Sequence, residues 1–458
     1  MRYFRLFVFI LTLNALPFGF SPLIAQENGS LDSLTQRLEA VDQQVRMLAR
    51  KIELEQEAAA AKAKEASSVV AGKDGFSLKS ADGKFQFKLR GYVQTDGRFF
   101  GGDEEKRLVN TFIMRRVRPI FEGTLDKNFS FYMMLDFGGG TSVIQDAYVD
   151  FTYLSQAKLR IGKLKEPFGI ERLQSGANLL FIERALPNNL VPNRDIGVQL
   201  HGEILKTTVT YAIGAFNGVT DGGSADTDAG DEKDYVARLF IHPFKNSAHT
   251  SLQNFGFGVA YSTGTQQGTA ASPGLAAYRT PAQQSYFSYR SDGTAANTTI
   301  ASGKRTRISP QGYFYAGAFG LFGEYVVSEQ QVARTTNTAR LKSDAFQVAA
   351  SYVLSSQKVT YRGVTVSKPF DPKAGSWGVL ELSARYNKLN ADKDAFPVFA
   401  NRASAAQSAT GWSVGFNWYL NKNAKFTVDY EQTKFEGGAA TGDRKDEKII
   451  FSRLQISY

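Results

Sequence analysis

The last eight residues of the chain, FSRLQISY (451–458), alternate between two kinds of side chain. In an extended segment, Leu454, Ile456 and Tyr458 share one face, and Arg453 and Gln455 share the other, because successive side chains of a strand point to opposite sides. A strand that runs to the final residue needs a neighbour on each side, or its edge is exposed. The ending therefore predicts a closed sheet in which the last strand pairs with the first.

The same period of two begins near residue 84 and continues through the chain. In KFQFKLRGYVQ (84–94), Phe85, Phe87 and Leu89 alternate with charged or polar residues, and FSFYMMLDF, QDAYVDFTY, GWSVGFNWYL and AKFTVDYEQTKF repeat the pattern. Short turns alternate with long Gly/Ser/Thr-rich loops, as in outer-membrane barrels. We predict an all-β transmembrane antiparallel barrel of about 16 strands over 83–458. A soluble β-sandwich with a buried C-terminal strand is the alternative.

Three segments precede the predicted barrel. Residues 1–25 combine basic residues with an apolar core and are expected to be a signal peptide, or alternatively an uncleaved anchor helix. Residues 29–66 carry heptad-spaced Leu, Val and Ile and predict a short α-helical coiled coil in the periplasm. A lone amphipathic helix packed on the barrel or on a partner is the alternative. Residues 67–82 are expected to form a linker.

Composition restricts the class of protein. The chain of 458 residues has no cysteine, so no disulfide holds it together. After the signal segment no apolar run reaches the ~18 residues of a membrane helix, which excludes a helical membrane protein but not a barrel. The formal charge is +10. In an exported protein, this excess of Lys and Arg favours small anions or anionic lipid as binding partners over nucleic acid. We expect outer-membrane lipid to surround the barrel.

Basic residues concentrate on the faces predicted to line a pore. The candidates in the early strands are Lys88, Arg90, Arg115, Arg116, Arg118, Arg160, Lys163 and Lys165. Rings of Arg and Lys in a pore form an anion pathway, and the guanidinium fork matches oxyanions. Carboxylates such as Asp146 would hold the arginines apart and moderate affinity. The alternative for any single Lys or Arg is a structural role, as a solvated or salt-bridged residue of the barrel wall.

The segment 166–195 does not have a strand pattern and is too long for a plain turn. A loop folded into the barrel would narrow the pore at mid-height, so we predict the constriction at Arg172, Ser175 and Arg184. The alternatives are an extracellular cap and a loop that packs between the subunits of a trimer.

The order RRVRPIFEGTLDKNFSFYMMLDF, QDAYVDF, LRIGKLKEPFGIERLQSG, FIERAL and the terminal RLQISY resembles the phosphate-selective porin O and P family of Gram-negative outer membranes. The resemblance covers essentially all of the chain after residue 84. It implies a homotrimer of 16-stranded barrels in the outer membrane, each with its own pore narrowed by infolded loops. The expected function is a water-filled, anion-preferring channel for passive uptake of phosphate or similar small anions.

The resemblance also implies roles for single residues. The paired arginines of the family's central site fall on Arg115 and Arg116, its lysine on Arg172 and its serine on Ser175. An acidic position falls on Asp146 or its neighbour. The dense arginine ladder of phosphate-specific members is missing from the loop that follows residue 267, which favours general anion preference over strict phosphate specificity.

Two further functions are weighed against this expectation. A general diffusion porin for mixed small solutes would use the same barrel without strong anion preference. The helix could tether the barrel to peptidoglycan or to a periplasmic partner, alongside transport. An enzyme is not expected: the three histidines accompany no nucleophile motif, and the sequence offers no metal-ligand spacing and no cofactor motif.

Overall fold

The computed structural model describes residues 28–65, 67–72, 75–101, 108–228 and 230–458. The predicted signal peptide, 1–25, lies outside these residues. The chain divides into two compact units, 1–66 and 67–458. The first contains α1 (Asn28–Glu65), and the second contains all strands of the described residues.

The helix predicted for 29–66 is present as α1, and its apolar stripe is exposed. Leu38 is 73% exposed, and Leu34, Val45 and Leu48 are each more than half exposed. The coiled coil itself stays a prediction. Within the described part of the chain, no helix is both long enough and apolar enough to cross a membrane.

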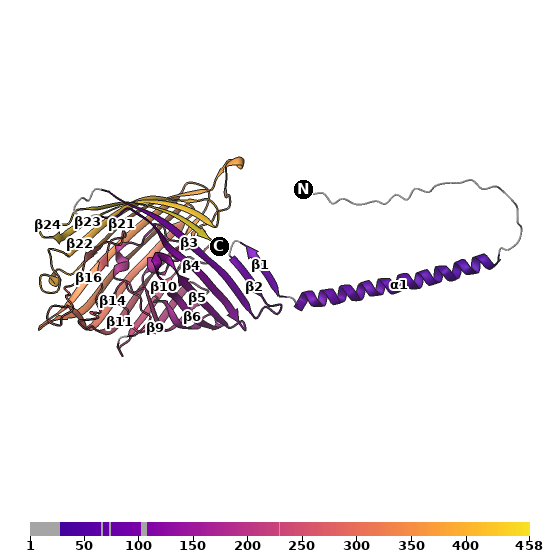
Figure 1. The fold of residues 1–458 in the computed structure, drawn as a ribbon, viewed down its shortest axis with the longest axis horizontal. Coiled ribbons are helices and arrows are strands. Elements are labelled where there is room, and N and C mark those ends of the chain that lie inside the picture. The colour runs from indigo at the N-terminus through magenta and orange to yellow at the C-terminus, as the bar shows by residue number, and fades with distance from the viewer. Residues whose placement is uncertain (1–27, 66, 73–74, 102–107, 229) are drawn as a thin grey trace. The chain divides into compact units, whose positions relative to one another are not determined.

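Sixteen strands of the described residues close into an antiparallel barrel, as predicted (Figure 1). They are β3 (Gln86–Gly101), β4 (Thr111–Leu125), β5 (Phe129–Asp136), β6 (Val143–Leu154), β7 (Ala157–Lys165), β8 (Arg194–Ile204), β9 (Val209–Phe216), β10 (Asp234–Ile241), β11 (Asn254–Gln267), β14 (Ile300–Ala316), β15 (Phe319–Arg334), β16 (Asn337–Val353), β21 (Val379–Asn390), β22 (Ala406–Tyr419), β23 (Ala424–Ala439) and β25 (Glu447–Ser457). Each pairs with the next in this order, and β25 pairs with β3, so the sheet has no free edge along this seam.

The last strand confirms the reasoning from the C-terminal sequence. Leu454 and Ile456 are 48% and 45% exposed on the outer face, whereas Arg453 and Gln455 are 3% and 6% exposed and point inward. The backbone of Tyr458 exchanges two hydrogen bonds with Gly91, at 2.8 and 3.0 Å, where β25 meets β3. An apolar exterior and a polar interior are the distribution that a barrel in lipid requires.

The two rims of the barrel differ in their connections. The near rim, where β3 begins and the chain ends, has mostly short turns, such as 420–423 between β22 and β23. Two connections at this rim are longer: 242–253 and the segment 354–378, which contains β17 (Val359–Thr360), β18 (Gly363–Val364), β19 (Phe370–Asp371), η3 (Pro372–Ala374) and β20 (Ser376–Trp377). This segment packs Val359 and Val366 against the inward-facing Tyr315. The far rim carries the long loops 166–193, 217–233 and 268–299.

The segment expected to be a linker, 67–82, instead contains a hairpin of β1 (Ser68–Gly72) and β2 (Gly75–Lys79). The correction has a physical reason. Because β25 ends opposite Gly91, the first residues of β3 have an unpaired edge, and β2 pairs with that edge between Gln86 and Leu89. The hairpin lies beside the C-terminus at the near rim (Figure 1).

Loops fill much of the lumen towards the far rim. Phe168, Leu186 and Val191 from the loop 166–193 and Phe287 from the loop 268–299 are fully buried against strand residues. The short elements in the loops are η1 (Gly138–Gly140), α2 (Ile170–Leu173), η2 (Leu186–Asn189), β12 (Tyr278–Arg279), β13 (Ser285–Phe287), η4 (Lys393–Ala395) and β24 (Gly442–Asp443). The part of the lumen that the loops do not fill is bordered by polar side chains of the barrel wall.

Candidate functional site: a cationic lumen

The loop 166–193, here called the crossing loop, traverses the barrel from β7 to the opposite wall. Its Ile170 N–H donates to Glu324 Oε2 of β15 at 2.8 Å, and its Ile182 N–H donates to Asp429 Oδ2 of β23 at 2.6 Å. The Leu186 N–H bonds Asn387 of β21. Side-chain acceptors from the wall thus satisfy backbone donors of the loop. The infolded loop predicted from the sequence is present and divides the lumen.

A β-bulge turns two consecutive arginines of β4 towards this loop. Gln94 pairs with Arg116 and the next residue of β3 pairs with Met114, so Arg115 is the extra residue. A bulge redirects a side chain that strict alternation would send outward. Arg115 and Arg116 therefore both form ion pairs with Glu183 of the crossing loop.

Glu183 is the centre of a buried ion-pair cluster. Its carboxylate accepts two hydrogen bonds from Arg115, and Arg98 Nη2 lies 3.1 Å away. The guanidinium nitrogens of Arg116 and Arg453 lie 3.7 and 3.9 Å from its oxygens. Glu183 is 3% exposed, so these pairs are largely shielded from water. The cluster fixes the crossing loop to β3, β4 and β25.

The far cavity, about 470 Å³, lies on the side of the crossing loop that faces the far-rim loops. The cations that line it are Arg115, Arg116, Arg172, Arg184 and Arg279, and the carboxylates are Glu183 and Asp221. Within the loop, Arg172 Nη2 donates to the Asn188 carbonyl at 2.8 Å, and Arg184 Nη2 donates to the Gln174 carbonyl at 2.9 Å. Backbone carbonyls orient these two arginines, and the nearby carboxylate of Glu171 offsets part of their charge.

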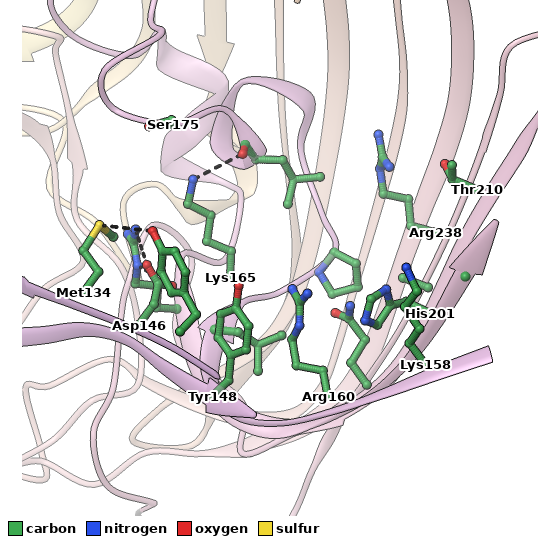
Figure 2. Close-up of a pocket in the computed structure, with 18 of the residues that line it drawn as sticks. Met134, Asp146, Tyr148, Lys158, Arg160, Lys165, Ser175, His201, Thr210 and Arg238 are labelled. Atoms are coloured by element: carbon green, nitrogen blue, oxygen red, sulfur yellow. Dashed lines mark hydrogen bonds and ion pairs between the residues drawn. The ribbon is translucent and has the colours of Figure 1, made fainter. Parts of the chain in front are cut away.

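The middle cavity, about 440 Å³, lies on the other side of the crossing loop (Figure 2). The cations that line it are Arg118, Lys158, Arg160, Lys165, Arg194 and Arg238, and the carboxylates are Asp146 and Glu203. Lys165 points to the loop, where it donates to the carbonyls of Leu173 and Gln174 at 3.3 and 2.7 Å. Asp146 accepts two hydrogen bonds from Arg194, at 3.1 and 3.2 Å.

Arg118 and Arg160 line the middle cavity with a carboxylate behind each. Arg118 Nε donates to Asp136 Oδ2 at 2.7 Å, and Arg160 donates to both oxygens of Asp150, at 2.9 and 2.5 Å. Ser175 also borders this cavity and is exposed to it.

The near cavity, about 780 Å³, opens towards the near rim. The cations that line it are Lys88, Arg90, Arg362, Lys422 and Lys425, and its acidic side chain is Glu122. Arg90 binds both oxygens of Glu122, at 2.9 and 2.8 Å, and Lys88 Nζ lies 3.6 Å from Glu122.

Lys163 departs from the expectation that it lines the pore. It belongs to the same register as Leu159 and Ile161, which are 37% and 42% exposed on the outer face, and it borders none of the three cavities. Its ammonium group forms an ion pair with Asp226 of the loop 217–233. Counting by two from Arg160 would have shown that Lys163 falls on the opposite face.

Sequence reasoning missed several residues that hold the site together. We did not single out Glu183 from the sequence, because its partners lie on β3, β4 and β25, which are far from the crossing loop in the sequence. Arg453 forms a buried bidentate pair with Asp96, at 2.6 and 2.7 Å. The inward register of the last strand was a usable signal for Arg453. The described residues contain no group of three or more His, Cys, Asp or Glu that could hold a metal.

Comparisons with known proteins agree with this architecture. Residues 87–458 match the family described as phosphate-selective porin O and P. Porin O of Pseudomonas aeruginosa is 22% identical over 427 residues, which are 86% of this chain and 93% of that protein. The family match confirms the resemblance seen in the sequence.

Solved structures with the same fold include the outer membrane channel DcaP of Acinetobacter baumannii, with a TM-score of 0.55 and 12% identity over 85% of this chain and 100% of that one. An anion-selective porin from Comamonas acidovorans has a TM-score of 0.51 and 11% identity over 82% of this chain and 100% of that one. These likenesses concern the barrel fold. Because the family match spans nearly the whole barrel, the chain belongs to the phosphate-selective porin O and P family.

Proposed function

We propose that the protein forms a water-filled outer-membrane channel that conducts small anions in preference to cations, with phosphate among its solutes. One observation carries the proposal: each of the three cavities has five or six Lys and Arg side chains and at most two Asp and Glu side chains along its boundary. Side chains that carry charge of one sign along a pore attract ions of the opposite charge and repel ions of the same charge. The proposed role is transport and includes no catalysis.

Phosphate is proposed as a solute because the cations beside the crossing loop are mostly arginines. Their planar N–H groups match the oxygens of a tetrahedral oxyanion and replace part of its hydration. Arg172 Nε is buried without a hydrogen-bond acceptor among the described residues, and Arg115, whose side chain is 26% exposed, borders the same far cavity. Several such groups in series allow an anion to enter and leave without being trapped.

The test is chloride conductance in planar bilayers with phosphate titrated into the bath. Phosphate is expected to block the chloride current partially, and Arg116→Ala and Arg172→Ala are expected to weaken the block. Arg340→Ala is the matched control, because Arg340 is 52% exposed at its side chain and borders none of the three cavities. A current that phosphate leaves unchanged in all of these proteins would refute the phosphate site.

The remaining expectations concern assembly and placement. We propose a homotrimer, with the near rim and the helix α1 in the periplasm. The exposed heptad stripe of α1 supports association through the helix, either between copies or with peptidoglycan or a periplasmic protein. A relative by fold, OmpT of Vibrio cholerae, has a structure described as a trimer form. Deletion of residues 29–66, followed by mass measurement in detergent and by conductance recording, separates a role in assembly from a role in transport.

A further inference from the structure

Four side chains on the inner wall form a continuous stack. The rings of Tyr132 and Tyr148 lie nearly parallel, with an interplanar angle of 13° and centroids 5.2 Å apart. The guanidinium carbon of Arg160 lies 4.2 Å from the centroid of Tyr148, and that of Arg90 lies 5.8 Å from the centroid of Tyr132. A guanidinium near a ring within about 6 Å is attracted by the negative face of the ring. Two arginines thus flank a pair of tyrosines.

The backbone register explains why these residues meet. Tyr132 and Tyr148 are directly paired across β5 and β6. Cross-strand partners on one face of a sheet lie close enough for aromatic side chains to stack. Figure 2 shows Tyr148 and Arg160 pointing in the same direction from neighbouring strands.

Each arginine of the stack is held in the same way from behind. Arg90 uses Nε and Nη2 to bind both oxygens of Glu122, and Arg160 uses Nε and Nη2 to bind both oxygens of Asp150. A guanidinium group has five N–H donors, so Nη1 and one hydrogen of Nη2 remain on each after the carboxylate is bound, and Arg90 has a further side-chain hydrogen bond with Tyr132. The side chains of Arg90 and Arg160 are 35% and 23% exposed.

The stack joins two of the cavities. Arg160 and Tyr148 border the middle cavity, Arg90 borders the near cavity, and Tyr132 borders both. An anion that leaves the middle cavity for the near rim along this wall therefore passes the four side chains in sequence. The edges of aromatic rings are electropositive, so the tyrosines between the two cations present no repulsive surface to an anion at their edge.

We propose that this stack is a track that guides small anions between the middle and near cavities, and that Tyr132 and Tyr148 are positioning residues for the two guanidinium groups. The inference rests on the proposed anion channel. The carboxylate behind each arginine and the ring beside it fix the guanidinium in place, so that the N–H groups not bound to the carboxylate or to Tyr132 can bind a passing anion. Without the ring, the arginine side chain regains rotamers and can turn these donors away from the path.

The test compares anion-to-cation permeability ratios of reconstituted channels in potassium chloride gradients. Tyr148→Leu and Tyr132→Leu are expected to lower the ratio by about twofold to fivefold, the scale of one lost cation–π contact. Tyr148→Phe and Tyr132→Phe keep the ring and are expected to retain the ratio of the unmodified protein. Tyr430→Leu is the matched control, because Tyr430 alternates with the buried Asp429 and Glu431 and lies on the outer face. Heat-modifiable migration on gels checks that each barrel is folded.

The outcomes separate the two proposals. If the unmodified channel shows no anion preference, the proposed function fails. If it prefers anions and the folded leucine variants keep the same ratio, the track fails and the proposed function stands. If the phenylalanine variants lose as much as the leucine variants, the hydroxyl groups matter and the positioning role of the rings is refuted.

Discussion

Glu183→Gln is the substitution that tests most sharply how the crossing loop is held. The change keeps the shape of the side chain but removes the carboxylate charge at the centre of four arginines. Glu183 is the acidic residue through which the loop meets β3, β4 and β25. We expect the barrel to form, with the loop less firmly fixed across the lumen.

The size of the effect follows from burial. Removing one partner of a buried ion pair costs about 3–5 kcal/mol, because the remaining charge is left without compensation. Arg453 retains its bidentate bond with Asp96, so not every arginine of the cluster is left unpaired. The loop also keeps the backbone bonds of Ile182 and Leu186 to the wall. We therefore expect a loss near the lower end of that range, about 3 kcal/mol.

Thermal unfolding in detergent and single-channel recording measure the two consequences. The Glu183→Gln channel is expected to unfold at lower temperature and to show larger, noisier conductance, because the loop that narrows the pore is more mobile. Glu203→Gln is the matched control: Glu203 borders the middle cavity, and the described residues give its side chain no ion pair. It makes the same change in charge. Equal stability and equally quiet currents in the two variants would refute the proposed anchoring role.

Three further substitutions test other parts of the account. Arg194→Ala leaves Asp146 unpaired beside the middle cavity, so the anion-to-cation permeability ratio should fall by about tenfold or less; an unchanged ratio would show that this pair lies off the conduction path. Tyr361→Ala removes the hydrogen bond from the segment 354–378 to the Ile170 carbonyl of the crossing loop, and conductance should rise. A conductance equal to that of the unmodified channel would contradict a role of this contact in narrowing the pore. Deletion of Tyr458 removes two backbone hydrogen bonds to the first strand, about 1–3 kcal/mol in total, and should lower the yield of heat-resistant barrel in refolding assays; an unchanged yield would argue that closure does not depend on the last residue.

Much of the barrel could be predicted because its pattern is local. The period of two identified the strands, and the strand-like ending predicted the closure of β25 on β3. The hairpin β1–β2 had a local signal that we did not use, because an Asp-Gly pair at 74–75 separates two short runs of strand-forming residues. The pairing of β2 with β3 could not be predicted in this way, because it depends on where β25 stops along β3.

The site was predictable in composition but not in arrangement. Alternation gives inward positions to Arg116 and Arg118, whereas Arg115 reaches the lumen only because of a bulge that the sequence does not reveal. Glu183 could not be chosen from among the acidic residues of the loop, because its partners on β3, β4 and β25 are reached only when the loop folds into the closed barrel. Lys163 was misplaced because a dense run of bases was assigned to one face without counting the register.

The zero-current potential of the unmodified channel across a potassium chloride gradient tests the central claim most directly. If the cations along the three cavities govern permeation, the potential will have the sign set by chloride moving down its gradient. A potential near zero would indicate a general diffusion pore, and a potential of the opposite sign would indicate that potassium passes more easily. Either result would contradict the assignment of the lumen as a path for anions.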